Sequence, residues 1–109
     1  PIGYVQAGIE LDSLPTDLHH PAVTAYCQKM LLRHASTRER LPFLSEFYRQ
    51  TLASIAPVHS VLDLACGLNP LAIAHLPLAA GAPYAACDVY SDLAGYLNQF
   101  FAHFSIPGF

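Results

Sequence analysis

The chain has 109 residues, of which 53% are hydrophobic and only 12% are charged. This length corresponds to one domain or less, and the composition excludes a disordered chain, whose low hydrophobicity and high charge prevent a core. A membrane span is also excluded, because prolines interrupt the most apolar stretch, residues 71–87, and a spanning helix needs roughly 20 unbroken apolar residues. The chain begins with Pro1 and shows no signal peptide, so we expect a processed or excised piece of a cytoplasmic protein.

The charges are distributed unevenly along the chain. The net charge of −3 argues by itself against a nucleic-acid binder. Beyond residue 50, however, the only charged residues are Asp63, Asp88 and Asp92, whereas all basic residues lie earlier: Lys29, Arg33, Arg38, Arg40 and Arg49. This asymmetry indicates different tasks for the two halves, although a solvated helix face that happens to be basic is the alternative.

The three cysteines, Cys27, Cys66 and Cys87, are widely spaced, which is typical neither of a zinc site nor of a disulfide framework. We therefore expect reduced thiols, with Cys66 and Cys87 as packing residues. The adjacent histidines His19 and His20 lack the spacing of a metal-binding motif, so no metal is predicted.

The first 57 residues are predicted to be helical after an irregular arm over residues 1–20, which holds at most one short helical turn. A first helix is expected from about 21 to 33, because Pro21 suits its first position and a core-facing stripe follows at helical spacing: Val23, Tyr26, Cys27, Met30 and Leu31.

Ser36-Thr37-Arg38-Glu39 fits a helical capping box, so residues 36–41 are predicted to form one turn. A longer helix is then expected from Pro42, which cannot lie inside a regular helix, to Pro57. Its predicted apolar face consists of Leu44, Phe47, Tyr48, Leu52 and Ile55.

The second half alternates between strands and helices. Residues 60–64 and 83–88 are short apolar runs that each carry an acid at or near the end, as buried parallel strands do. A short helix is expected from about 69 to 76 with Asn69 as its N-cap. Ser91 is expected to cap a last helix with an apolar stripe at Leu93, Leu97, Phe100, Phe101 and Phe104. This order predicts an α/β fold with a parallel sheet.

The chemistry is concentrated in Asp63-Leu64-Ala65-Cys66-Gly67, followed about 20 residues later by Asp88. A strand, a turn of small residues, a helix start and an acid after the next strand is the arrangement that binds nucleotide cofactors, with the acid holding the ribose. The turn is not G-x-G-x-x-G, and Pro70 removes an N–H that a phosphate would need. A cofactor without phosphates, S-adenosylmethionine, therefore fits better than a dinucleotide.

Three strings support this interpretation: His34-Ala-Ser-Thr-Arg-Glu-Arg-Leu41, Val61-Leu-Asp-Leu-Ala-Cys-Gly-Leu-Asn-Pro-Leu71 and Ala86-Cys-Asp-Val-Tyr90. Together they resemble the aminoglycoside-resistance 16S rRNA methyltransferases, over roughly residues 20–105. The resemblance implies methylation of guanine N7 in the decoding site of the small ribosomal subunit. It also implies a helical, rRNA-gripping segment over residues 1–57 and a Rossmann-like class I methyltransferase domain, of which residues 58–109 are the first β-α-β-α unit.

The resemblance also implies roles for individual residues. The methionine and ribose side of S-adenosylmethionine would lie against Asp63, Ala65 and Gly67, and Asp88 would hold the ribose. Further cofactor contacts would come from Val89 or Tyr90 at the adenine, from Arg38 at the carboxylate and from His34 beside it. Contacts to rRNA phosphates would come from the remaining basic residues: Lys29, Arg33, Arg40 and Arg49.

Methyl transfer to guanine N7 needs no general base, because N7 carries a free lone pair at neutral pH, and positioning suffices. Only two strands are predicted, so we expect a truncated piece that is inactive alone or adheres to itself through an open strand edge. Two alternatives stay open: a non-catalytic remnant that binds the cofactor or a partner protein, and half of an NAD-type oxidoreductase.

Overall fold

The computed structural model describes residues 3–33, 44–64, 66–88 and 90–108. The predictions for His34, Arg38, Arg40, Ala65 and Val89, and the capping box with its turn, lie outside this part of the chain. The elements in chain order are α1 (Tyr4–Asp12), α2 (Pro21–Leu32), α4 (Leu44–Thr51), β1 (Val61–Leu64), the 3-10 helix η2 (Asn69–His75), β2 (Tyr84–Cys87) and α5 (Ser91–His103).

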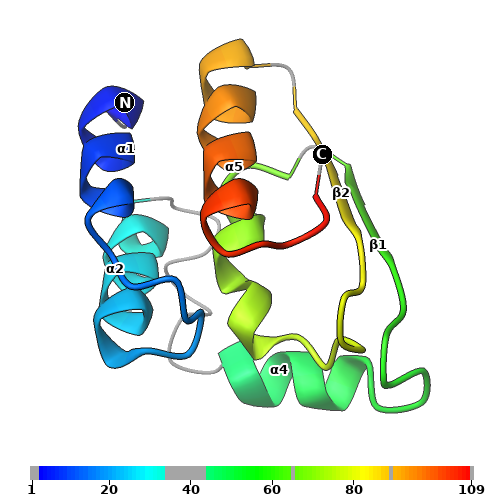
Figure 1. The fold of residues 1–109 in the computed structure, drawn as a ribbon. Helices are drawn as coiled ribbons and strands as arrows, with labels where there is room; N and C mark the ends of the chain where they lie inside the picture. Colours follow the sequence, from blue (N-terminus) through cyan, green and yellow to red (C-terminus); the bar gives the residue numbers. More distant parts are fainter. Residues whose placement is uncertain (1–2, 34–43, 65, 89, 109) are drawn as a thin grey trace.

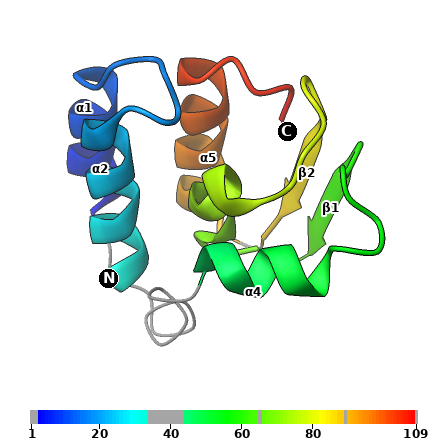
Figure 2. The same ribbon diagram turned by 90° about the horizontal axis from the view of Figure 1, so that it is seen from below.

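The elements are arranged in three layers. Figures 1 and 2 show α1 with α2 in the first layer, α5 with η2 in the second and the two strands in the third, while α4 crosses below the sheet. Helix α1 packs on α5, and both α2 and α4 pack on η2. The middle layer therefore joins the N-terminal helices to the sheet.

The strands β1 and β2 are parallel, as the sequence predicts, and Val61 lies opposite Tyr84 while Asp63 lies opposite Ala86. Side chains alternate between the faces of a strand, so Val61, Asp63 and Tyr84 share one face. That face is covered by α5, because the rings of Tyr84 and Phe101 lie 5.6 Å apart. Leu62 points to the opposite face and is 68% exposed.

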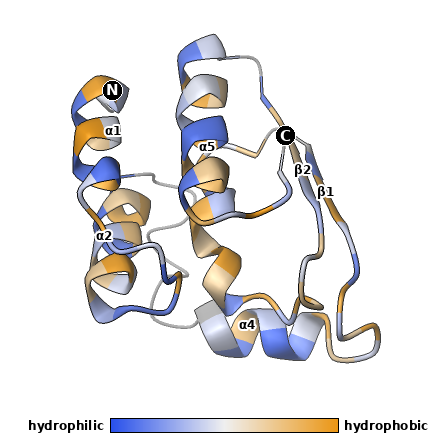
Figure 3. Ribbon diagram, viewed as in Figure 1, coloured by the Kyte–Doolittle hydropathy of each residue, from blue (hydrophilic) through white to orange (hydrophobic). Residues whose placement is uncertain are grey.

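One buried cluster includes side chains from both halves of the chain. The predicted stripes of α2 and α5 are confirmed, since all their members are buried. Tyr26 joins the layers: its hydroxyl donates to the carbonyl oxygen of Ala7 at 2.9 Å and lies 2.5 Å from the hydroxyl of Tyr96. Figure 3 shows η2 mostly in the colours of hydrophobic residues, as its central position requires.

The prediction of an irregular arm over residues 1–20 is wrong, because Tyr4–Asp12 form a regular helix. Its apolar face is short but buried: Ala7, Gly8 and Leu11 pack inward. The side chain of Gln99 donates to the carbonyl oxygen of Gly8 at 2.9 Å, and an added Cβ at Gly8 would lie 2.7 Å from this side chain. The glycine that weakens the helical pattern therefore lets α1 approach α5.

Several local predictions also need correction. The helix α4 ends at Thr51 rather than near Pro57, and the hydroxyl of Thr51 bonds the carbonyl of Phe47. Phe47 and Ile55, both members of the predicted apolar face, are exposed. The N-caps precede the predicted ones by one residue, at Leu68 and Tyr90. The helix from 69 is of the tighter 3-10 type. Finally, Cys87 is exposed, whereas Cys66 is buried as expected.

Candidate functional site

The chain bends sharply after β1, at the carboxyl ends of both strands. The N–H of Cys66 donates to the carbonyl oxygen of Cys87 at 2.9 Å, so the bend stays paired with the end of β2. Gly67 has a φ of 53°, in the left-handed region that is easily accessible only to residues without a Cβ. Parallel sheets of this kind bind ligands at the carboxyl ends of their strands, and this bend lies there.

Asp88 reaches across from the end of β2 to the bend. Its Oδ2 accepts the backbone N–H of Gly67 at 2.9 Å. The carboxylate is only partly buried, and a main-chain donor fixes its orientation. The structure thus brings together Gly67 and Asp88, which the sequence placed 21 positions apart.

Asp63 is the third residue of β1, which leads into this bend. Burial raises the pKa of the Cys66 thiol to about 11, and the negative charges of Asp63 and Asp88 both add to this rise. The ends of the two strands at the bend therefore carry two carboxylates, of which Asp88 bonds the bend directly.

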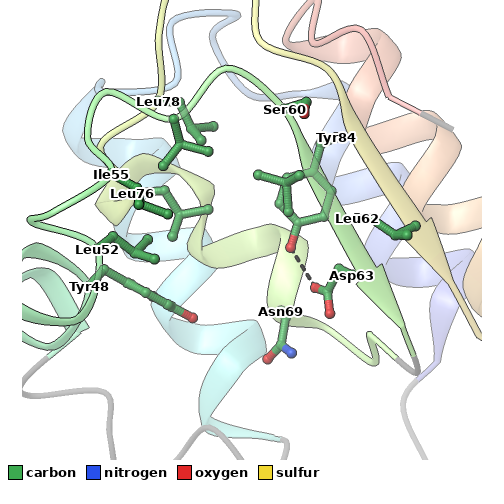
Figure 4. A pocket seen from close by; sticks show the side chains of 12 residues that line it. Tyr48, Leu52, Ile55, Ser60, Leu62, Asp63, Asn69, Leu76, Leu78 and Tyr84 are labelled. Carbon is green, nitrogen blue, oxygen red and sulfur yellow. Dashed lines mark hydrogen bonds between the residues drawn. The ribbon is translucent and has the colours of Figure 1, made fainter.

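The carboxylate of Asp63 has a specific partner. Its Oδ2 accepts the hydroxyl of Tyr84 at 2.5 Å, and Figure 4 shows this bond at the inner wall of a cavity. The cavity has a volume of about 410 Å³. Tyr48 lines it from α4 and Leu52 from the turn that follows α4, opposite Asp63 and Tyr84.

The start of η2 does not offer a phosphate cradle. Pro70, at the second position of this helix, has no N–H, and the seven-residue helix is 3-10. The N–H of Gly67 is already bonded to a carboxylate, which repels phosphate oxygens. Among the described residues of this bend, nothing resembles the site at which dinucleotide-binding folds hold a pyrophosphate.

Of the remaining predicted cofactor contacts, the structure describes Tyr90. Tyr90 immediately precedes α5 and is 65% exposed. Sequence reasoning missed Tyr84, which bonds Asp63. No motif marks Tyr84, because it reaches Asp63 only through the register of the two strands. Burial, together with the negative charges of Asp92 and Asp88, raises the pKa of Tyr4 in α1, whose ring lies 5.3 Å from that of Tyr96.

Two of the predicted RNA-binding residues form ion pairs. Lys29 Nζ lies 2.6 Å from Glu10 Oε2, and Arg49 donates to both carboxylate oxygens of Glu46 at 2.5 and 2.9 Å. Arg33 is exposed at the end of α2. All three side chains lie on helices or helix ends of the N-terminal half.

Comparison with known proteins places the bend in context. The sequence profile of the family described as "Ribosomal RNA methyltransferase (FmrO)" matches residues 12–108. This chain belongs to that family. The match covers both strands, the bend and all helices after α1.

Three curated relatives carry the name 16S rRNA (guanine(1405)-N(7))-methyltransferase. The protein of Micromonospora echinospora is 37% identical over 98 residues, which are 90% of this chain and 36% of the relative. That of Frankia casuarinae is 44% identical over 78 residues, or 72% and 28% of the two chains. That of Micromonospora olivasterospora is 49% identical over 65 residues, or 60% and 22%.

The chain of this methyltransferase family member therefore spans between 22% and 36% of the length of these relatives. Within residues 3–33, 44–64, 66–88 and 90–108, no helix is long and apolar enough to cross a membrane. The same ranges contain no group of three or more histidine, cysteine or acidic side chains that could hold a metal ion.

Proposed function

We propose that the protein to which this chain belongs transfers a methyl group from S-adenosylmethionine to guanine N7 of 16S rRNA in the small ribosomal subunit. The chain would supply two parts of that enzyme. Residues 58–109 form the start of a Rossmann-like cofactor domain, and residues 1–57 form a helical segment that contacts rRNA. The names of the relatives and the family membership support this proposal.

The observation that carries the choice of cofactor is the negative charge of the bend. Asp88 accepts the N–H of Gly67 in the bend, and Asp63 is the third residue of β1, which leads into the bend. Two carboxylates attract the sulfonium and ammonium groups of S-adenosylmethionine and repel a pyrophosphate. This charge, together with the proline at the start of η2, disfavours the alternative of an NAD-type oxidoreductase half.

The donors and acceptors at the bend fit this cofactor. Asp88 would accept hydrogen bonds from the ribose hydroxyls, as the acid after the second strand does in related folds. Its orientation is fixed in advance by the N–H of Gly67, which lowers the cost of ordering the site on binding. Gly67 lacks a side chain, so it leaves room for a ligand to approach the backbone. When bound, the cofactor supplies an electrophilic methyl group.

The remaining proposed contacts follow from the resemblance and from charge. Arg38 and His34 would bind the carboxylate of the cofactor, Ala65 would line its methionine side, and Val89 or Tyr90 would flank the adenine. These contacts complete a site in which the chain binds and orients the methyl donor and excludes water, and in which no side chain has to move a proton.

The proposed rRNA contacts are Lys29, Arg33, Arg40 and Arg49. The ion pairs of Lys29 and Arg49 are exposed, and exposed pairs contribute little stability. Both cations can therefore exchange their carboxylate partner for an rRNA phosphate at low cost.

The proposal is tested with the full-length protein, radiolabelled S-adenosylmethionine and small ribosomal subunits. We expect methyl incorporation that maps to one guanine N7. Asp88→Asn should weaken cofactor affinity at least about tenfold, because charged hydrogen bonds to the ribose are lost. Asp17→Asn, which removes the same charge at a remote exposed position, should leave the affinity within about twofold.

Three results would contradict the proposal. Unchanged cofactor affinity in Asp88→Asn would show that this acid does not hold the ribose. Cofactor binding without any methyl transfer to the subunit would favour the alternative of a non-catalytic remnant, and tighter binding of NAD than of S-adenosylmethionine would favour an oxidoreductase.

A further inference from the structure

The hydroxyl of Tyr84 makes an unusual hydrogen bond for a core tyrosine. Buried hydroxyl groups need a partner, and most side-chain hydrogen bonds go to backbone or water. Tyr84 is 2% exposed, yet its hydroxyl donates to the Asp63 carboxylate at 2.5 Å. Asp63 is the third residue of β1, which leads into the bend that carries the proposed cofactor site.

The register of the sheet explains why these two groups meet. Val61 is opposite Tyr84, and Asp63 is opposite Ala86. Tyr84 and Asp63 are therefore diagonal neighbours on one face, a spacing that an aromatic side chain can bridge. The ring of Tyr84 extends along the sheet toward the bend, as Figure 4 shows.

Neighbouring elements fix the position of this ring. The ring of Phe101 in α5 lies 5.6 Å from it, and the N–H of Tyr84 donates to the carbonyl oxygen of Pro107 at 3.0 Å. Burial and the nearby carboxylate raise the pKa of Tyr84, so the phenol keeps its proton. Its hydroxyl acts as a fixed donor to Asp63.

We propose that Tyr84 is a positioning residue, which holds the Asp63 carboxylate in the orientation that binds the cationic methionine end of the cofactor. This inference rests on the proposed function. Hydrogen bonds to an ionised acceptor are short and about twice as strong as neutral ones, so a single hydroxyl can set the orientation of the carboxylate. Tyr84 itself would not touch the cofactor.

The test measures S-adenosylmethionine affinity by calorimetry on the full-length protein. Tyr84→Phe removes only the hydroxyl and should weaken affinity about tenfold, the value of a charge-assisted hydrogen bond. Tyr96→Phe is the matched control, because Tyr96 is 3% exposed and its hydroxyl bonds Tyr26 at 2.5 Å. The control should lose thermal stability but keep its affinity within about twofold.

A second pair of variants separates positioning from folding. In an Asp63→Ala background no carboxylate is left to orient, so adding Tyr84→Phe should change the affinity by less than about twofold. Neither variant of this pair leaves the partly buried Asp63 carboxylate without its hydrogen-bond donor. The comparison therefore stays informative even where the single Tyr84→Phe variant does not fold. Affinity for the small ribosomal subunit should be the same in all variants.

Three outcomes would overturn the inference. If Tyr84→Phe binds the cofactor normally while Asp63→Ala binds it weakly, Asp63 acts without Tyr84 and the proposed function stands. If Tyr84→Phe weakens binding equally with and without Asp63, the tyrosine acts through packing. If the unmodified protein does not bind S-adenosylmethionine, the proposed function fails and the inference fails with it.

Discussion

At the scale of single residues, the pKa values of the thiols depend on their burial and on nearby charges. Burial raises the pKa of Cys27 to about 12, and burial with two nearby carboxylates raises that of Cys66 to about 11. A raised pKa keeps a thiol protonated at neutral pH, and only the thiolate reacts with electrophiles. Cys87, which is exposed at the end of β2, lacks this protection by burial.

We therefore predict unequal alkylation of the three cysteines at pH 8. Cys87 should react with iodoacetamide on the order of a hundredfold faster than Cys27 and Cys66, because the buried thiols form very little thiolate. Peptide mass spectrometry after timed labelling measures the three rates separately. Rapid labelling of Cys66 would contradict the prediction, because it would show that this thiol is accessible and readily forms a thiolate.

The sequence alone was sufficient to select Asp63, Gly67 and Asp88 as the centre of the candidate site, because their spacing follows from strand and turn lengths. It was not sufficient to find Tyr84. The contact between Tyr84 and Asp63 depends on the register of β1 with β2. Contacts set by pairing and docking leave no local pattern.

At the scale of elements, the chain after α5 returns to the sheet. Gly108 forms a parallel bridge with Tyr84, and Phe101 lies directly above it. A Cβ on Gly108 would lie 2.4 Å from the ring of Phe101. Phe101 is 1% exposed and cannot move aside, so the glycine is required for this close approach.

Replacing two glycines should have opposite effects on stability. Gly108→Ala should lower the free energy of unfolding by about 1–3 kcal/mol, because it overpacks the core. Gly95→Ala, in α5 with open space around it, should raise it by roughly 0.5–1 kcal/mol through helix propensity. Urea unfolding followed by circular dichroism measures both. Equal effects of the two substitutions would contradict the close packing at Gly108.

The accuracy of the element predictions follows the density of apolar side chains. The helices α2 and α5 have continuous stripes, and both predicted ends of α2 and the predicted start of α5 agree with the structure to within one residue. The helix α1 has only Ala7, Gly8 and Leu11 buried, so its pattern resembles a loop. After α4, the N–H of Val58 donates to the carbonyl oxygen of Pro77 at 2.7 Å, a pairing of distant residues that no propensity encodes.

At the scale of the whole molecule, the described residues form a sheet of two strands. Its order is β1-β2, and Figure 2 shows helices of the described residues on one face only. Leu62 is 68% exposed on the other face. Since two-stranded sheets are marginally stable without further packing, we expect this face to be covered in the longer relatives.

The isolated chain should consequently self-associate. Leu62→Lys places a charge on the uncovered face, where it would block apolar contacts between copies. We expect sedimentation velocity to show concentration-dependent oligomers for the unmodified chain and a larger monomer fraction for Leu62→Lys. Ile9→Lys, on the exposed face of α1, provides a control, and an equal effect of both substitutions would show that the sheet face is not the contact.

The order of strands and helices, and the parallel pairing, could be predicted because a β-α-β-α sequence allows few topologies. The target base could not be predicted from spacing or composition, and the names of the relatives are what indicate it.

A crystal structure of the full-length protein with S-adenosylhomocysteine would test most directly whether the cofactor binds at the bend after β1. We expect the nucleoside to occupy this bend, with both ribose hydroxyls hydrogen-bonded to Asp88 and the amino-acid end beside Asp63. A nucleoside bound elsewhere, or a bend filled by side chains of the completed sheet, would contradict it.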